Sequence, residues 1–137
     1  AVLTGYEMAL SKKLKCGSDI WLNTPRITRE ASGTSGMTAA MNGSLNLTAN
    51  DGWIPEFGRH RENAFVLPEA DVRQPVSVQD ELDSQHLYQM LENEVIPLYY
   101  EDQDAWTDMV FTGYKDVAPA FSSDRMAAQY YRELYNA

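Results

Sequence analysis

The chain has 137 residues, and 11 lysines and arginines against 20 aspartates and glutamates give it a formal net charge of −9 at neutral pH. Hydrophobic residues make up 44% and charged residues 23% of the sequence, which is typical of one globular domain or a piece of one and excludes a collagen, a coiled-coil rod and a wholly disordered chain. The acidic balance argues against a nucleic-acid or anionic-membrane partner. The sequence contains no apolar run of about 18 residues, so it predicts no membrane-spanning helix.

The first half of the chain alternates helical and extended patterns. Apolar residues recur at helical spacing before Gly17, and short apolar or alternating runs between turn residues predict strands. In chain order, we predict a helix over 6–15, a buried strand over 20–22, a helix over 37–41 that Gly43 caps, a strand over 45–49 and a buried strand over 64–67.

The second half is predicted to be helical. Its first helix contains apolar residues at helical spacing from Leu87 to Leu98, and we expect Ser84 to cap it and Pro97 to kink or end it. A second helix is predicted over 103–112. A third starts near Ser122, with Phe121 and Met126 in the positions of a hydrophobic staple and Met126, Tyr130 and Leu134 on one apolar face.

This order of elements predicts an α/β fold with a short parallel sheet followed by C-terminal helices. About three strands are few for a doubly wound sheet, so the chain is either the C-terminal part of a larger domain or pairs with another chain, and we favour the fragment. We divide it into an α/β part over 1–67, a connection over 68–80 and helices over 81–137. Missing sheet neighbours would favour self-association, including a homo-oligomer.

The segment 32–36, Ser-Gly-Thr-Ser-Gly, directly precedes the predicted helix over 37–41. Glycines allow a sharp turn, and the free N–H groups of a first helical turn form an anion site suited to phosphate. The hydroxyls of Thr34 and Ser35 could add donors beside Gly36. The alternative is an ordinary strand–helix loop with a Ser/Thr cap.

Glu30 lies three residues before Gly33. At the carboxyl edge of a parallel sheet its carboxylate could accept hydrogen bonds from sugar hydroxyls, and the alternative is a solvated loop carboxylate. Arg26 and Arg29 flank Glu30 and could bind phosphate or pair with it. The two histidines, His60 and His86, are too isolated along the sequence to suggest a metal site or a catalytic triad.

Cys16 is the single cysteine, which excludes an intrachain disulfide and a cysteine-based metal cage. We expect it to be a small buried residue in a reducing compartment, so the predicted location is the cytoplasm. The chain begins Ala1-Val2-Leu3 without a basic segment, and we expect neither a signal peptide nor the true start of the protein there.

The segments 30–37 and 39–43, EASGTSGM and AAMNG, resemble the C-terminal signature of the α-glucan phosphorylases, which act on glycogen, starch and maltodextrin. Further stretches agree with that family in the right order. The segment 19–25 agrees before the signature. After the signature, the agreeing stretches are Asp51-Gly52-Trp53 with Glu56, 94–100 and 121–126. The resemblance covers nearly the whole chain and is more specific for the family than for the activity.

This resemblance implies a two-lobed glycosyltransferase fold, with the chain as the C-terminal part of the second Rossmann-like lobe. Members of the family cleave the end of an α-1,4-glucan with inorganic phosphate and release glucose 1-phosphate with retained configuration. The phosphate of pyridoxal phosphate (PLP) acts there as proton donor and acceptor. By position, Glu30 would bind glucose hydroxyls, Ser32 and Gly33 would offer backbone groups to the sugar, and Thr34, with Ser35 and Gly36, would contact the cofactor phosphate.

One position departs from the family pattern. Thr38 occupies the place of the lysine that forms the Schiff base with PLP, and a threonine hydroxyl cannot form an imine. None of the lysines at 12, 13, 15 and 115 matches the motif position. The resemblance therefore leaves open a phosphorylase, a PLP-independent glucan synthase that uses a nucleotide sugar, and a non-catalytic glucan-binding module. The 137 residues alone are expected to be inactive, because half of the cleft is missing.

Overall fold

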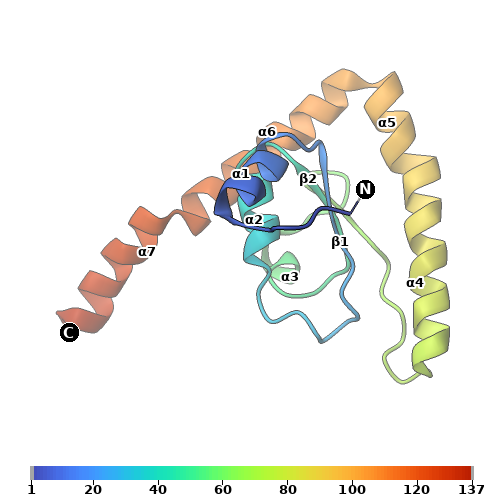
Figure 1. Ribbon diagram of the computed structural model, residues 1–137, viewed down its shortest axis with the longest axis horizontal. Coiled ribbons are helices and arrows are strands. Elements are labelled where there is room, and N and C mark those ends of the chain that lie inside the picture. The colour runs from blue at the N-terminus through green and yellow to red at the C-terminus, as the bar shows by residue number, and fades with distance from the viewer. Residues whose placement is uncertain (1, 137) are drawn as a thin grey trace.

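The computed structural model describes residues 2–136. Three short parallel strands, β1 (Ile20–Asn23), β2 (Leu45–Thr48) and β3 (Ala64–Val66), form a sheet in the order β1-β2-β3. Parallel strands need crossover connections, and these pass through the helices α2 (Thr34–Ala40) and α3 (Ile54–Phe57) (Figure 1). The predicted short parallel sheet with helices is confirmed.

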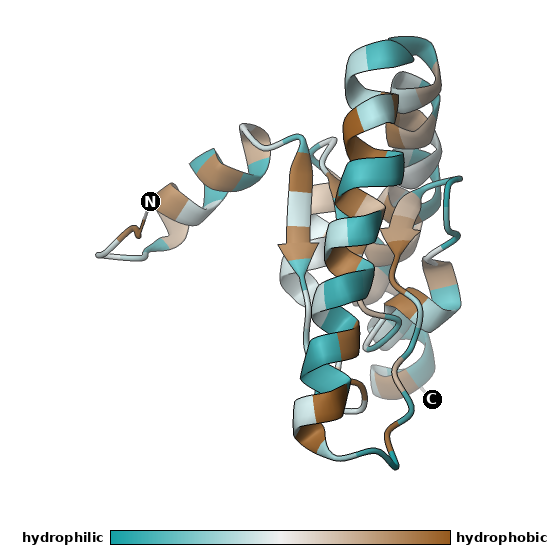
Figure 2. Cartoon of the chain, turned by 90° about the vertical axis from the view of Figure 1, so that its right-hand side faces the viewer, coloured by the Kyte–Doolittle hydropathy of each residue, from teal (hydrophilic) through white to brown (hydrophobic). Residues whose placement is uncertain are grey.

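The remaining helices frame this sheet. Helix α1 (Met8–Cys16) precedes it and projects from the body of the molecule (Figure 2). After β3 come α4 (Val76–Met90), a π-helical turn (Leu91–Val95), α5 (Ile96–Glu101), α6 (Gln103–Phe121), α7 (Ser123–Tyr130) and a second π-helical turn (Tyr131–Tyr135). No helix within residues 2–136 has the length and apolar character needed to cross a membrane.

Helices cover both faces of the sheet, and β2 is buried along its whole length. One apolar cluster joins strand residues to the helical segment from α4 to α6, and a smaller one gathers α2, α3 and the end of α6. The first consists of Leu45, Leu47, Phe65, Leu67, Met90, Val95, Leu98, Trp106 and Met109, and the second of Ala40, Trp53, Ile54 and Val117. The outward surface of α4 is mostly hydrophilic (Figure 2).

Two predictions of buried residues were wrong. The side chain of Leu22 is 53% exposed, because β1 lies at the edge of the sheet and has β2 as its single strand neighbour within the described residues. Cys16 is exposed at the end of α1, where its thiol donates to Oδ1 of Asn42 at 3.2 Å.

Helix boundaries also differ from the predicted ones. Helix α4 begins at Val76 after Pro75, within the predicted connection, and Ser84 lies inside it, where it caps nothing. Its first turns are exposed, so they carry no apolar pattern. Helix α2 begins at Thr34 rather than at residue 37, and α6 continues to Phe121 rather than to residue 112. The predicted helix start near Ser122 is confirmed: α7 begins at Ser123, and Oγ of Ser122 caps it by accepting from the Arg125 N–H at 3.1 Å.

Pro97 does not end the helix that contains it. The preceding π-helical turn lets the Ile96 N–H donate to the Leu91 carbonyl, five residues back. Proline lacks an N–H and its ring crowds the carbonyl four residues earlier, so a wider turn at this point accommodates it. Helix α5 then continues to Glu101.

Candidate functional site

The predicted site residues lie on the loop from β1 to α2 and on the first turn of α2. This loop leaves the carboxyl end of β1, and the segment 49–53 leaves the carboxyl end of β2 beside it. Because neighbouring parallel strands end at the same edge of the sheet, the two segments meet. Glu30 and Ser32 belong to the first, and Asp51, Gly52 and Trp53 belong to the second.

Asp51 binds the backbone of the site loop. Its Oδ2 accepts from the N–H groups of Arg29 and Glu30, both at 3.0 Å, and its Oδ1 accepts from the Gly52 N–H at 2.9 Å. Burial raises the pKa of the Asp51 carboxyl, but the backbone hydrogen bonds from Glu30, Gly52 and Arg29 outweigh burial and hold the pKa below its ordinary value. Asp51 is therefore ionised at neutral pH.

The two segments touch through glycines. The Trp53 N–H donates to the Ser32 carbonyl at 2.9 Å, and a Cβ on Gly52 would lie 2.5 Å from that same oxygen. Gly33 has a φ of 96°, and a Cβ there would lie 3.0 Å from Cδ1 of Trp53. Both glycines also have positive φ, so side chains are excluded by conformation and by contact.

The first turn of α2 presents free donors. The N–H groups of Gly36 and Met37 both donate to the Gly33 carbonyl, at 3.1 and 3.4 Å. The N–H groups of Thr34 and Ser35 have no acceptor within residues 2–136. They lie at the positive end of a helix, and together they are able to bind an anionic oxygen.

A buried asparagine holds this turn against the sheet. Asn46 of β2 donates from Nδ2 to the Gly36 carbonyl at 3.1 Å. Sequence reasoning missed Asn46 and treated Asp51 and Trp53 as part of the resemblance. The available signal was a polar residue in a short strand with apolar neighbours, because such a residue needs a partner when it is buried.

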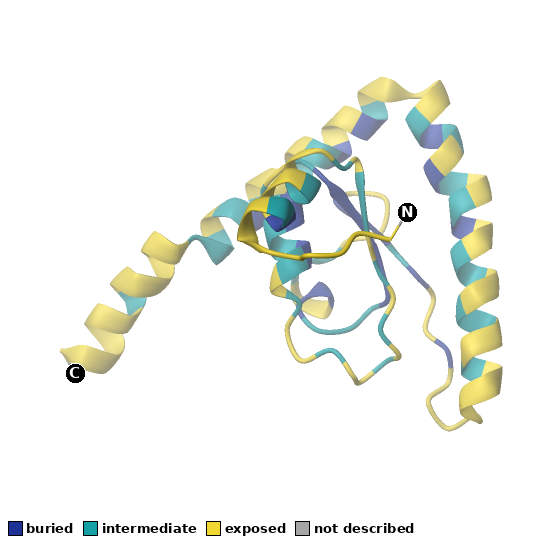
Figure 3. Ribbon diagram, in the orientation of Figure 1, coloured by how far each residue is buried: buried dark blue, intermediate teal, exposed yellow. Residues whose placement is uncertain are grey.

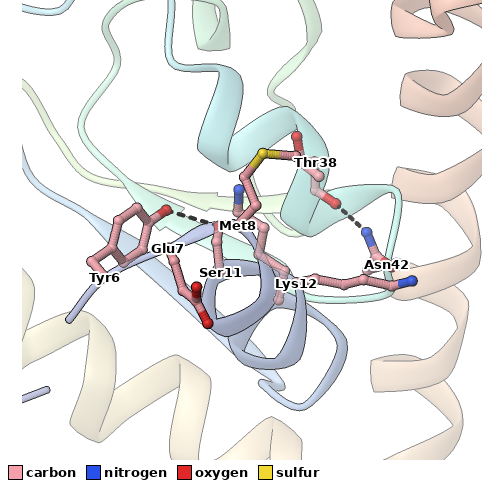
Figure 4. Close-up of a pocket in the computed structure, with 8 residues that line it drawn as sticks. Tyr6, Glu7, Met8, Ser11, Lys12, Thr38 and Asn42 are labelled. Atoms are coloured by element: carbon pink, nitrogen blue, oxygen red, sulfur yellow. Dashed lines mark hydrogen bonds between the residues drawn. The ribbon is translucent and has the colours of Figure 1, made fainter. Parts of the chain in front are cut away.

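Thr38 faces a pocket between α1 and α2, with a volume of about 450 Å³. Its Oγ1 donates to the Thr34 carbonyl at 2.8 Å, so the hydroxyl is hydrogen-bonded to its own helix. Figure 4 displays the lining. It comprises Tyr6, Glu7, Met8, Ser11, Lys12, Lys15, Thr38 and Asn42. Two lysines of α1 thus share the pocket with Thr38, which the motif alone did not predict.

The flanking arginines do not pair with Glu30. Arg26 donates from Nε and Nη2 to both carboxylate oxygens of Asp80 in α4, each at 2.8 Å, and the Arg29 guanidinium forms no ion pair within residues 2–136. His60 is less isolated than its sequence position indicates, because its Nε2 lies 3.1 Å from Oε2 of Glu94. Across the described part of the chain, no group of three His, Cys, Asp or Glu residues could hold a metal ion.

Comparison with known proteins gives this site its context. No family model matches the chain. The maltodextrin phosphorylase of Thermococcus litoralis is 42% identical to it over 135 residues, which are 98% of the chain. The glycogen phosphorylases of Mycobacterium tuberculosis and Aquifex aeolicus are 36% and 37% identical over 140 and 141 residues, or 98% and 99% of the chain. The chain belongs to the α-glucan phosphorylase family.

The chain is much shorter than those relatives. It spans 16% of the length of the Thermococcus and Mycobacterium proteins and 20% of the Aquifex protein. The loop that meets Asp51 and Trp53 is therefore one part of a larger protein. The family membership agrees with the resemblance of segments 30–37 and 39–43.

Proposed function

We propose that this chain is the C-terminal active-site segment of a cytoplasmic α-glucan phosphorylase-like glycosyltransferase. The full-length protein would use phosphate to cleave an α-1,4-glucan and release glucose 1-phosphate with retained configuration. The observation that carries this proposal is the loop at 29–36, which Asp51, Gly52 and Trp53 hold at the carboxyl edge of the sheet. The relatives named as maltodextrin and glycogen phosphorylases support it.

Each predicted site residue has a role in this proposal. The Glu30 carboxylate accepts hydrogen bonds from glucose hydroxyls, and backbone groups of Ser32 and Gly33 contact the same sugar. The free N–H groups of Thr34 and Ser35, with the turn that Gly36 allows, bind a phosphate group. Charge repulsion does not oppose a neutral glucan, although the chain carries a net charge of −9.

The residues of α2 do not fit a covalently bound PLP. Helix α2 contains no lysine, and the hydroxyl of Thr38 cannot form an imine and already donates to the Thr34 carbonyl. We therefore expect no PLP attached at position 38. The backbone donors at the start of α2 do not depend on that side chain, so noncovalent binding of a phosphate group remains part of the proposal.

The same threonine supports a second candidate function. A glucan synthase that transfers glucose from a nucleotide sugar needs phosphate-binding backbone groups and no lysine, so Thr38 is compatible with it. Incubation of the full-length protein with maltoheptaose, with phosphate in one reaction and with a nucleotide-activated glucose in a second, tests the two functions directly. Glucose 1-phosphate supports the phosphorylase, glucose transfer from a nucleotide sugar supports the synthase, and glucan binding without turnover supports a non-catalytic module.

A lysine substitution tests the origin of the site. We expect Thr38→Lys in the full-length protein, incubated with PLP and reduced with borohydride, to carry a pyridoxyl group that peptide mass mapping locates at position 38. Thr107→Lys is the matched control, because Thr107 lies in a helix and donates to the carbonyl four residues back, as Thr38 does. An unlabelled position 38 together with unchanged activity would favour a site built for another donor.

A further inference from the structure

The turn before Glu30 has a backbone conformation that its sequence disfavours. The Arg29 N–H donates to the Arg26 carbonyl at 3.0 Å and closes a turn around Ile27 and Thr28. Thr28 has a φ of 73°, in the left-handed region. A β-branched residue rarely adopts this conformation, because its Cβ crowds the backbone, so surrounding contacts must impose it.

Contacts from outside the turn hold its backbone in place. Asp51 accepts from the N–H groups of Arg29 and Glu30, directly after the strained residue. Arg26, at the other end of the turn, is fixed by the two hydrogen bonds to Asp80 of α4. The Asp51 contacts adjoin Glu30 itself and come from the loop after β2, so the direction of Glu30 depends on a residue 21 positions later in the chain.

We infer that Asp51 is a positioning residue for Glu30, which it orients by holding the 26–29 turn in its strained conformation. Because three backbone N–H groups occupy its oxygens, the Asp51 carboxylate acts through the loop and need not touch a sugar. The inference rests on the proposed function only where it assigns sugar binding to Glu30. The control of the turn by Asp51 is independent of any substrate.

Two measurements on the full-length protein test this role. The first is the affinity for maltopentaose without phosphate, measured by isothermal titration calorimetry. The second is the rate at which trypsin cleaves after Arg29, measured by mass mapping of the released peptide. We expect Asp51→Ala to weaken maltopentaose binding and accelerate this cleavage by about tenfold each, because strain of this kind then relaxes into other loop conformations.

A second substitution separates positioning from general stability. Glycine adopts a positive φ without strain, so Thr28→Gly added to Asp51→Ala should restore both quantities to within about threefold of wild type. Asp71→Ala is the control, because Asp71 also accepts a backbone N–H, from Arg73 at 2.9 Å, but does so in the loop between β3 and α4. We expect Asp71→Ala to change neither quantity by more than about twofold.

The two readouts also separate this inference from the proposed function. If the wild-type protein does not bind maltopentaose, the sugar-binding role of Glu30 is wrong, and the trypsin rates alone decide the role of Asp51. Unchanged cleavage after Arg29 in Asp51→Ala would overturn the inference. Faster cleavage that Thr28→Gly does not reverse would also overturn it, because Asp51 would then not act through the strained turn.

Discussion

Gly36 leaves no space for a side chain between α2 and its neighbours. A Cβ at this position would lie 2.6 Å from Oδ1 of Asn46 and 3.1 Å from Nε1 of Trp53. Asn46 is buried and hydrogen-bonded, so it cannot move away freely. We expect Gly36→Ala to lower the free energy of unfolding by about 1–3 kcal/mol through overpacking.

Chemical denaturation of the full-length protein measures this change. Ser35→Ala is the matched control, since the Ser35 side chain makes no hydrogen bond within residues 2–136, and it should change the free energy by less than about 0.5 kcal/mol. Equal unfolding midpoints for Gly36→Ala and wild type would show that the turn can shift without cost.

Asp116 of α6 makes the stability of the fold depend on pH. Its Oδ2 accepts from Nδ2 of Asn63 at 2.8 Å and from Nη2 of Arg59 at 2.7 Å. Burial raises the pKa of Asp116, but the hydrogen bonds from Asn63 and Arg59 outweigh burial and lower the pKa overall. Its contribution to stability is therefore complete above the unfolded pKa of about 3.9 and is lost as the pH falls through the lower folded pKa.

The lowered pKa of Asp116 gives a prediction for Asp116→Asn. Between pH 5 and pH 2, its free energy of unfolding should fall less steeply than that of wild type, because one carboxylate with a lowered pKa is gone. Urea titrations at several pH values measure the slope. Asp108→Asn, on the exposed surface of α6, serves as the control, and equal slopes for Asp116→Asn and wild type would contradict the prediction.

Sequence reasoning selected the residues of the candidate loop but not those that hold it. Glu30 and the segment 32–36 form one continuous stretch with a glycine pattern, which local rules can interpret. Asp51 and Asn46 act on residues 10 to 22 positions away, and their contacts exist only because β1 and β2 pair in a particular register. Residue types alone do not give that register.

Asp102 separates α5 from α6 and caps the longer helix. Its Oδ1 accepts from the Ala105 N–H at 3.0 Å, and its carbonyl accepts from the Trp106 N–H at 3.0 Å. We expect Asp102→Ala to lower the free energy of unfolding by about 1 kcal/mol, because one N–H of the first turn loses its acceptor. Scanning calorimetry measures the change, Asp108→Ala is the mid-helix control, and equal losses in both variants would contradict the capping role.

The sequence predicted helical turns that have a buried face better than helical turns that are exposed. The apolar spacing from Leu87 to Leu98 is correct because those turns pack against the sheet, whereas α4 extends back to Val76 through exposed turns without such a pattern. Ser84 has the chemistry of a cap but lies in mid-helix, where Pro75 has already fixed the start. Capping preference therefore cannot locate a helix end without tertiary context.

The molecule as a whole has open apolar surfaces. The outer edge of β1 is unpaired within residues 2–136. Neither α7 nor the π-helical turn after it has a buried residue (Figure 3), so Met126 and Tyr130 of α7 and Leu134 of that turn are exposed. We expect the isolated 137-residue chain to self-associate or to be poorly soluble, because unpaired strand edges and apolar patches promote association. Size-exclusion chromatography with light scattering measures this.

A charged substitution on the edge strand β1 tests whether strand pairing between copies causes this association. Leu22→Lys should reduce the apparent mass of the isolated chain, since lysine on an edge strand opposes strand pairing between copies. Lys13→Leu, on exposed α1, should not reduce it. A monodisperse and very stable wild-type monomer would argue that the described residues form a complete folding unit.

The π-helical turn at Leu91–Val95 limits how the length of this region can vary in evolution. The hydrogen bond of this turn spans five residues where an α-helical bond spans four, so a one-residue deletion within the turn would restore regular α-helical geometry and leave Met90 on the face that packs in the core. A one-residue deletion elsewhere in α4 removes no such extra residue and would rotate the preceding part of α4 by about 100° relative to α5. Part of the hydrophilic surface of α4 would then face the sheet, so this turn is the place in the segment where the length can change by one residue without a new apolar face.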